Sequence, residues 1–233
     1  MNSPKKNITP NRHGFWRNGY TTYRRLWIDS CLGVFAGEMN GVVIDLGGKR
    51  ENKRGLFKPP EYQARAWWYI NLDWVTAPSI FADVNRTPLQ AGSADCILCT
   101  EVLEHLQDPQ ACVDEIYRLL RDDGLVFAST PFFYPVDADP YDYQRFTDDG
   151  LRQLFRNFRS VTIYRMGGYP GVLGLMLELG IPGMNDGTAI SRFLQWAMKW
   201  ISRWLCWYDI LAFDKDATRW NKFTTGYFVK ASR

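Results

Sequence analysis

The chain has 233 residues, a formal net charge of +3 and a hydrophobic fraction of 46%. This length suffices for one large domain with its own core, and so small a charge gives no reason to expect nucleic acid as a partner. Two histidines are too few for a histidine metal cluster. The sequence contains no run of about 18 uncharged apolar residues, so it predicts no membrane-spanning helix.

The cysteines and the amino-terminal residues indicate the compartment. The five cysteines are an odd number, and the first ten residues, MNSPKKNITP, do not resemble a secretory signal. Free thiols are typical of the reducing cytosol, so we expect a cytoplasmic protein. Cys96 and Cys99 spell a CxxC pair, but residues three apart in a strand face opposite sides of a sheet. We therefore expect neither a metal nor a redox site there.

The polar residues 1–20 are expected to form a tail ahead of a single domain, residues 21–233. Apolar side chains at helical spacing predict an amphipathic helix from Thr22 to Glu38. Next, residues 41–48 (GVVIDLGG) predict a strand that runs into a glycine turn. Glycine permits a sharp turn and lets the backbone approach a ligand closely. The basic loop that starts at Lys49 either is solvated or holds an anionic group.

Aromatic and β-branched residues predict two further strands, residues 67–73 and 79–82. Asp73 ends the first of them, and Asp83 follows the second. A carboxylate at the end of such a strand can accept hydrogen bonds from both hydroxyls of a ribose. By its position alone, Asp83 can be a turn or cap residue.

Residues 93–131 predict a strand, a helix and a second strand. The apolar run 95–99 is typical of a strand covered on both faces. Asp108 and Pro109 indicate a helix start, and Gly124 indicates the helix end before a strand at 125–128. In such a unit the ligand binds outside the carboxyl ends of the strands, here at residues 100–105 and 130–131.

The segment 131–147 (PFFYPVDADPYDYQRFT) combines aromatic rings, carboxylates and one arginine. Rings stack on the apolar faces of a sugar while carboxylates accept hydrogen bonds from its hydroxyls. Tyr134, Tyr141, Tyr143 and Arg145 are therefore candidate acceptor-binding residues. Thr147 is expected to cap a short helix.

Two strands are predicted near the carboxyl terminus, at 161–164 and 225–229, with residues 166–222 inserted between them. The first half of the insertion, 167–187, is rich in glycine and indicates a loop or a broken helix. The second half, 188–213, predicts a helix with several tryptophans and a narrow polar stripe. Its broad apolar face covers the domain core, forms a homodimer interface, serves as a substrate lid, or lies in a membrane interface.

The motif Glu101-Val102-Leu103-Glu104-His105, with Asp108-Pro109 and the turn 121–124, resembles the middle of class I S-adenosylmethionine-dependent methyltransferases. Within that group, residues 131–147 resemble methyltransferases of glycan and cell-surface polysaccharide synthesis. The resemblance covers residues 41–158. It implies an α/β, Rossmann-like fold: a seven-stranded, mostly parallel sheet with a reversed carboxyl-terminal hairpin and helices on both faces.

The resemblance also implies S-adenosylmethionine as cofactor and assigns roles to individual residues. Two departures stand out: Lys49 and Arg50 replace the third glycine of the usual turn, and Asp137 stands where related loops carry a histidine. The general base is then His105, or Asp137 if burial raises its pKa, and Asp137 is otherwise a loop anchor. The implied cofactor-binding residues are Asp45, Gly47, Gly48, Asp73, Asp83 and Glu101.

We therefore expect methyl transfer to an acceptor oxygen on a sugar or lipid-linked glycan. Two alternatives stay open: a methyltransferase for a small hydrophobic acceptor such as a quinone or polyketide, and a non-catalytic protein with a degenerate cofactor fold. Residues 188–213 would allow peripheral contact with the inner membrane face.

Overall fold

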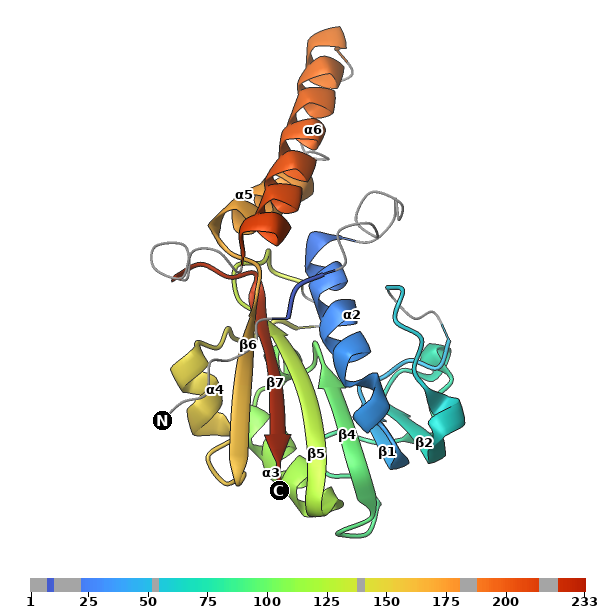
Figure 1. Cartoon of the computed structure of the whole chain (residues 1–233). Coiled ribbons are helices and arrows are strands. Elements are labelled where there is room, and N and C mark those ends of the chain that lie inside the picture. The colour runs from blue at the N-terminus through green and yellow to red at the C-terminus, as the bar shows by residue number, and fades with distance from the viewer. Residues whose placement is uncertain (1–7, 11–21, 52–54, 138–140, 181–187, 214–221) are drawn as a thin grey trace, which may run out of the picture.

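A computed structural model describes residues 8–10, 22–51, 55–137, 141–180, 188–213 and 222–233. Its centre is a seven-stranded sheet with the strand order β3-β2-β1-β4-β5-β7-β6 (Figure 1). The first five strands in this order are parallel, and β7 runs antiparallel to both β5 and β6. The predicted mixed sheet with a reversed carboxyl-terminal hairpin is thus confirmed. The strands are β1 (Gly41–Leu46), β2 (Ala64–Asn71), β3 (Ile80–Phe81), β4 (Ala94–Thr100), β5 (Leu120–Pro131), β6 (Ser160–Met166) and β7 (Gly226–Ser232).

Three helices begin with a side-chain cap, and two of these caps, Asp108 and Thr147, were predicted. Thr22, Asp108 and Thr147 each accept a hydrogen bond from a backbone N–H in the first turn of the helix that follows. These helices are α2 (Tyr23–Phe35), α3 (Pro109–Leu119) and α4 (Asp148–Leu154). The tail predicted at residues 1–20 lies outside the described residues except for 8–10.

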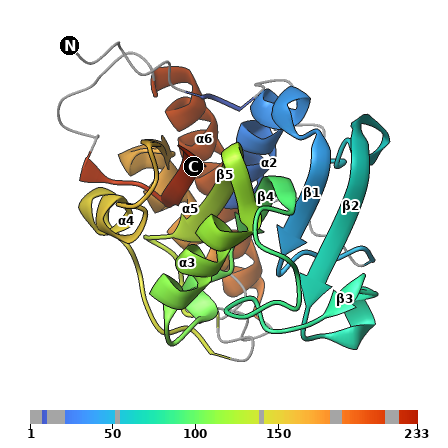
Figure 2. The ribbon, with the colours of Figure 1, turned by 90° about the horizontal axis from the view of Figure 1, so that it is seen from below.

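Two apolar layers cover the two faces of the sheet. Successive strand residues alternate between them: Val43 packs in the layer that contains α2, and Ile44 packs in the layer that contains α3 and α4. Figure 2 shows α2 and α3 on opposite sides of the strands. Cys96 and Cys99 fall in different layers, so the prediction that they face opposite sides of the sheet is confirmed.

Two element boundaries differ from the sequence prediction. The helix α3 ends at Leu119 instead of near Gly124, because Leu120 already pairs with Ala94 as part of β5. Residues 167–187 were expected to form a loop or a broken helix, but Tyr169–Gly180 form the helix α5. Gly171 packs closely against Tyr23 and Gly174 against α6, and this packing outweighs their weak helical propensity.

The helices α5 and α6 (Ala189–Ala212) follow β6 and precede β7 in the chain, and they pack against each other as an antiparallel pair. A Cβ on Gly174 would lie 2.6 Å from Cys206 Sγ, so glycine there permits close contact between the two helices. Ser202 Oγ donates to the Gly174 carbonyl at 2.7 Å. In Figure 1, α6 extends well beyond the end of the sheet. Among the described residues, no helix is long and apolar enough to cross a membrane.

The polar stripe predicted on the helix 188–213 is partly buried, and much of its apolar face is exposed. Asp209 accepts hydrogen bonds from the Tyr23 hydroxyl and, at 2.9 Å, from the Gly168 N–H. Ser202 and Asp209 are 1% and 2% exposed, whereas Trp204 is 58% exposed. The interpretation that this face covers the domain core is therefore wrong for Trp196, Trp200 and Trp204, which are half exposed or more. Cys206, Ile210 and Phe213 pack in the core instead.

Candidate cofactor and acceptor site

The candidate residues gather at one edge of the sheet because the parallel strands all end there. The chain passes outward from β1 to β2 and β3, then returns to place β4 on the other side of β1. Such a reversal leaves the loops after β1 and β4 facing each other at the position where open α/β sheets bind ligands. The loop after β1 carries Gly47, and the loop after β4 carries Glu101 and His105.

The glycine turn after β1 touches the loop after β4. Gly47 has φ of +73°, and a Cβ there would overlap a methyl group of Val102. A Cβ on Gly48 would overlap the carboxylate of Asp45. Both glycines are therefore required by space, and Gly47 also by backbone conformation. The turn keeps its form with two glycines, although Lys49 follows them directly.

The end of β2 holds this turn in place. Asn71 Nδ2 donates to the carbonyl oxygens of Gly47 and Gly48 at 3.0 and 3.1 Å, while its Oδ1 accepts from the Asp73 N–H at 2.9 Å. The strand ends at Asn71, two residues before the predicted end. Asn71 was missed as a site residue because only its tertiary contacts distinguish it from other strand residues.

Asp73 lies exposed next to the glycine turn and caps the short helix η3 (Trp74–Thr76). Its Oδ1 accepts from the Val75 N–H at 2.9 Å. This bond uses one carboxylate oxygen and orients the group, and a carboxylate has capacity for further hydrogen bonds. Asp73 therefore stands, as predicted, at the edge where a ribose could be held.

Two aromatic rings beyond Asp73 were not singled out from the sequence. Trp74 and Phe81 are stacked with ring centroids 4.5 Å apart and an interplanar angle of 4°. They are 68% and 44% exposed, so they present a flat apolar surface to solvent. The Asp83 carboxylate accepts from the Asn85 N–H at 2.9 Å, which is the contact of a turn residue.

Glu101 is engaged by a buried arginine that the sequence did not reveal. Arg24 Nε and Nη2 donate to the two carboxylate oxygens at 2.8 and 2.6 Å, and Arg24 Nη1 donates to the Thr225 carbonyl at 2.7 Å. Ser129 Oγ donates to Glu101 at 2.7 Å. Glu101 adopts φ of +56°, an uncommon conformation for a non-glycine residue. This network joins α2 to the ends of β4 and β5 and the start of β7.

His105 lies in the short helix η4 (Leu103–His105). It contacts the loop that follows β5 up to Thr147, which we call the acceptor loop because it carries the candidate acceptor-binding residues. Its Nδ1 lies 2.5 Å from the Tyr141 carbonyl oxygen. A carbonyl can only accept, so Nδ1 carries the proton and Nε2 of the neutral ring keeps its lone pair. Glu104 Oε1 lies 3.9 Å from Nε2. Burial and the charge of Glu101 raise the Glu104 pKa well above its usual value, which favours a neutral carboxyl beside the imidazole.

The acceptor loop after β5 is organised by an ion pair of its own. Arg145 Nη2 donates to Asp142 Oδ2 at 2.6 Å, and the Asp137 N–H donates to the same oxygen at 2.9 Å. Hydrogen bonds from Arg145 hold the pKa of Asp142 below its usual value. Asp137 itself is exposed. The burial on which its role as a base depended is therefore absent.

Of the three candidate tyrosines, one is partly buried and two are exposed. Tyr134 lies under Arg24, whose guanidinium carbon is 5.6 Å from the ring centroid. Tyr141 and Tyr143 are exposed, with ring centroids 5.6 Å apart, and Gln107 Nε2 donates to the Tyr143 hydroxyl at 3.0 Å. The described part of the loop thus presents aromatic rings outward, while Asp142 and Arg145 bind each other.

The basic loop after the glycine turn is only partly described, because Lys53 and Arg54 lie outside the described residues. Arg50 packs over the Tyr69 ring, 5.7 Å from its centroid, and its Nη2 donates to Ser79 Oγ at 2.9 Å. This cation therefore helps to hold the loop against β2. Across the described residues, no three His, Cys, Asp or Glu side chains come together as a set of metal ligands.

Part of this sequence is similar to known proteins, and the fold is similar to solved structures. Residues 61–128 match the family model of a methyltransferase domain. A ubiquinone biosynthesis O-methyltransferase from Actinobacillus pleuropneumoniae is 41% identical over 46 residues, and one from Xanthomonas oryzae pv. oryzae is 46% identical over 41 residues. The matched segments cover 20% and 18% of this chain and 20% and 17% of those proteins. This chain thus spans at most about a fifth of the length of the curated relatives it matches.

The structural neighbours cover nearly the whole chain at low identity. A methyltransferase from Archaeoglobus fulgidus has a TM-score of 0.55 at 12% identity, over 90% of this chain and 94% of its own. A phosphoethanolamine N-methyltransferase from Haemonchus contortus, in complex with S-adenosyl-L-methionine, has 0.52 at 12% identity, over 96% and 57%. The cyclase SpnF has 0.51 at 15% identity, over 93% and 84%, so the fold alone does not decide the reaction. Residues 61–128 are thus similar to a methyltransferase domain, and the chain has the fold of class I S-adenosylmethionine-dependent methyltransferases.

Proposed function

We propose that this protein binds S-adenosylmethionine and directs transfer of its methyl group to an oxygen of an acceptor. The observation that carries the proposal is the contact of Gly47 with Val102, which places the glycine turn beside the loop of Glu101 and His105. The cofactor supplies an activated methyl group. The main task of the protein in such chemistry is to hold the two reactants in line and away from water.

The residues at the sheet edge fit the parts of the cofactor. The space left by the missing side chain of Gly48, beside Asp45, suits the aminocarboxypropyl arm. Asp73 suits the ribose hydroxyls, and the stacked rings of Trp74 and Phe81 suit the flat face of an adenine. Glu101 serves this site through its ion pair with Arg24, which fixes the loop after β4.

We assign the general base to His105. Its Nδ1–H is held by the Tyr141 carbonyl, so Nε2 is the nitrogen that can take a proton from an acceptor hydroxyl. Asp137, the other candidate, is exposed to solvent. We expect His105→Asn to lower kcat by about 10²–10⁴-fold, while Asp137→Asn stays near wild type.

Two acceptor classes follow from the loop after β5. A hydroxyl on an apolar ring is favoured because Phe133, Tyr141 and Tyr143 are exposed while Asp142 is occupied by Arg145. The ubiquinone biosynthesis O-methyltransferases matched by part of the chain support this class. A sugar or lipid-linked glycan stays the second candidate, because the same exposed rings can stack on a sugar.

Calorimetric titration of S-adenosylmethionine and S-adenosylhomocysteine into the purified protein tests the cofactor proposal. The sharpest variant is Asp73→Asn, since asparagine keeps the cap on η3 but removes the negative charge. Binding that weakens in Asp73→Asn while Asp83→Asn stays near wild type supports the assignment. Absence of binding at millimolar cofactor would favour a protein that kept the fold and lost the cofactor.

The acceptor class is tested by methyl transfer from labelled cofactor to prenylated phenols and to sugar nucleotides in parallel. Transfer to the phenols that depends on His105 supports the apolar ring. Transfer to the sugars alone would establish the glycan candidate instead. Because cofactor binding is measured separately, failure of both acceptors would not be mistaken for loss of the cofactor site.

A further inference from the structure

The outer side of α6 exposes an unusual number of large apolar side chains. Trp196, Trp200 and Trp204 are 59%, 50% and 58% exposed, and their spacing of four residues places them along one side of the helix. We call this side, together with its neighbours, the apolar face of α6. It comprises Ile190, Phe193, Leu194, Trp196, Trp200, Ile201, Trp204 and Tyr208.

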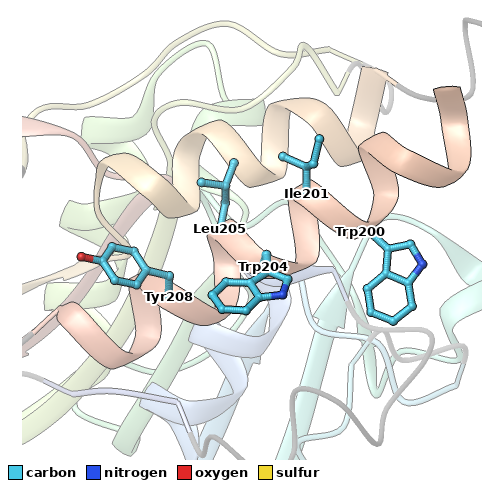
Figure 3. Close-up of a pocket in the computed structure, with 5 residues that line it drawn as sticks. All are labelled: Trp200, Ile201, Trp204, Leu205 and Tyr208. Carbon is cyan, nitrogen blue, oxygen red and sulfur yellow. The ribbon is translucent and has the colours of Figure 1, made fainter.

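The apolar face contains an open depression of about 310 Å³. Trp200, Ile201, Trp204, Leu205 and Tyr208 line it, as Figure 3 shows. All of its lining residues belong to α6 and none is a candidate cofactor or acceptor residue, so it is distinct from the candidate cofactor site. A contiguous exposed surface of this kind marks an interaction site in most proteins.

Positive charges follow one edge of this face. Arg192, Lys199 and Arg203 are seven and four residues apart, so they lie on the same side of α6, next to Trp196. The acid of α6, Asp209, is buried against Tyr23 on the opposite side. Glu178 of α5 interacts electrostatically with Arg203 and Lys199, and burial raises the pKa of its carboxyl. The outward side of α6 is therefore apolar with a positive edge.

We propose that α6 docks on the surface of an anionic phospholipid membrane. Tryptophans suit the boundary between headgroups and acyl chains because their rings are apolar and their indole N–H needs a polar partner. Lysine and arginine on the adjoining edge attract anionic headgroups. A second copy of the chain fits less well. In an antiparallel two-fold pair of α6 helices, the positive edges of both copies would lie on the same side and repel each other.

The position of α6 gives this docking a role. β7 is antiparallel to both β5 and β6, so β6 runs parallel to β5 and ends at the same edge of the sheet. α5 therefore starts at this edge, and β7 starts at the same edge after α6. The helix pair therefore emerges from the same edge as the candidate site and extends away from the sheet (Figure 1). Docking through α6 would hold that edge toward the membrane, where an acceptor with an apolar tail resides. The docking itself does not depend on the proposed methyl transfer.

Vesicle flotation of the purified full chain tests this inference. We expect the protein to float with phosphatidylcholine vesicles that contain phosphatidylglycerol, and less with phosphatidylcholine alone or at high salt. Replacing Trp196, Trp200 and Trp204 by alanine should lower the partition coefficient by roughly a hundredfold. These side chains are exposed, so the variant should fold, which circular dichroism would check.

Matched controls come from the opposite end of the sheet. Tyr62→Ala removes an aromatic ring that is 86% exposed, and Arg159→Gln removes an exposed cation; neither should change flotation. Lys199→Gln should weaken binding to the anionic vesicles. Absence of flotation by the wild-type chain, or flotation unchanged in the tryptophan variant, would overturn the inference. A dimer that the tryptophan variant loses, without flotation, would assign the face to a second copy instead.

Discussion

Two helices of this protein place their tryptophans in opposite environments. Trp27 of α2 is fully buried, with its ring centroid 4.6 Å from that of Phe213, whereas Trp204 of α6 is more than half exposed. α2 lies against the sheet with its large side chains inward. In contrast, α6 contacts α5 closely where Ser202 and Cys206 of α6 meet Gly174 of α5. The difference shows that the same residue type stabilises the fold in one region and is left free for contact in the other.

The sharpest test of this comparison is a pair of tryptophan substitutions. We expect Trp27→Ala to lower the free energy of unfolding by about 3–5 kcal/mol, because it removes a buried ring and leaves a cavity. Trp204→Ala should change it by no more than about 0.5 kcal/mol. Urea denaturation of the two variants measures both. A large cost of Trp204→Ala would mean that the apolar face of α6 is packed in solution.

A second test concerns charges instead of rings. Arg24→Met leaves the Glu101 carboxylate without its main partner and should cost about 3–5 kcal/mol. The matched control is Arg152→Met, since the ion pair of Arg152 with Asp148 is exposed and should contribute less than about 1 kcal/mol. Equal effects of the two substitutions in urea denaturation would contradict the structural role assigned to Arg24.

A third test addresses the contact between α5 and α6. Gly174→Ala places a methyl group 2.6 Å from Cys206 Sγ and 2.7 Å from the Ser202 carbonyl oxygen, so we expect a loss of about 1–3 kcal/mol. Gly180→Ala meets no atom within 4 Å and should be neutral or slightly stabilising. Thermal unfolding distinguishes them. A neutral Gly174→Ala would mean that the helices are not in close contact there.

The smallest effect is the pH dependence contributed by Asp209. Burial raises the pKa of Asp209 in the folded protein, against hydrogen bonds from Tyr23 and Gly168 that lower it. A carboxyl with a raised folded pKa contributes stability below its unfolded pKa near 3.8 and loses it as the pH rises through the folded value.

Comparison with Asp209→Asn isolates this contribution, because both proteins share all other titrating groups. The stability of the wild type relative to Asp209→Asn should therefore fall as the pH rises from about 4 toward neutrality. Urea denaturation at several pH values measures this difference. A difference that does not change with pH would show that Asp209 keeps the same pKa in the folded and unfolded states.

The sequence alone was sufficient for the order of the strands and of the helices α2, α3, α4 and α6, and for the sheet edge where the candidate site lies. Strand runs such as 95–99, the caps Asp108 and Thr147, and the glycine turn are local patterns, and local patterns determine local structure. The candidate residues Gly47 and Asp73 both lie at this edge, because parallel strands bring their carboxyl ends together.

Only the tertiary structure decided which side chains meet across the chain. Arg24 contacts Glu101 from 77 residues away, and Tyr23 contacts Asp209 from 186 residues away. No local spacing encodes such pairs, because they depend on how α2, β4 and α6 pack together. For the same reason the periodicity of α6 showed a broad apolar face but not its exposure. A helix buries the side that fits its neighbour closely, and here that side carries two serines, a cysteine, an aspartate and one isoleucine.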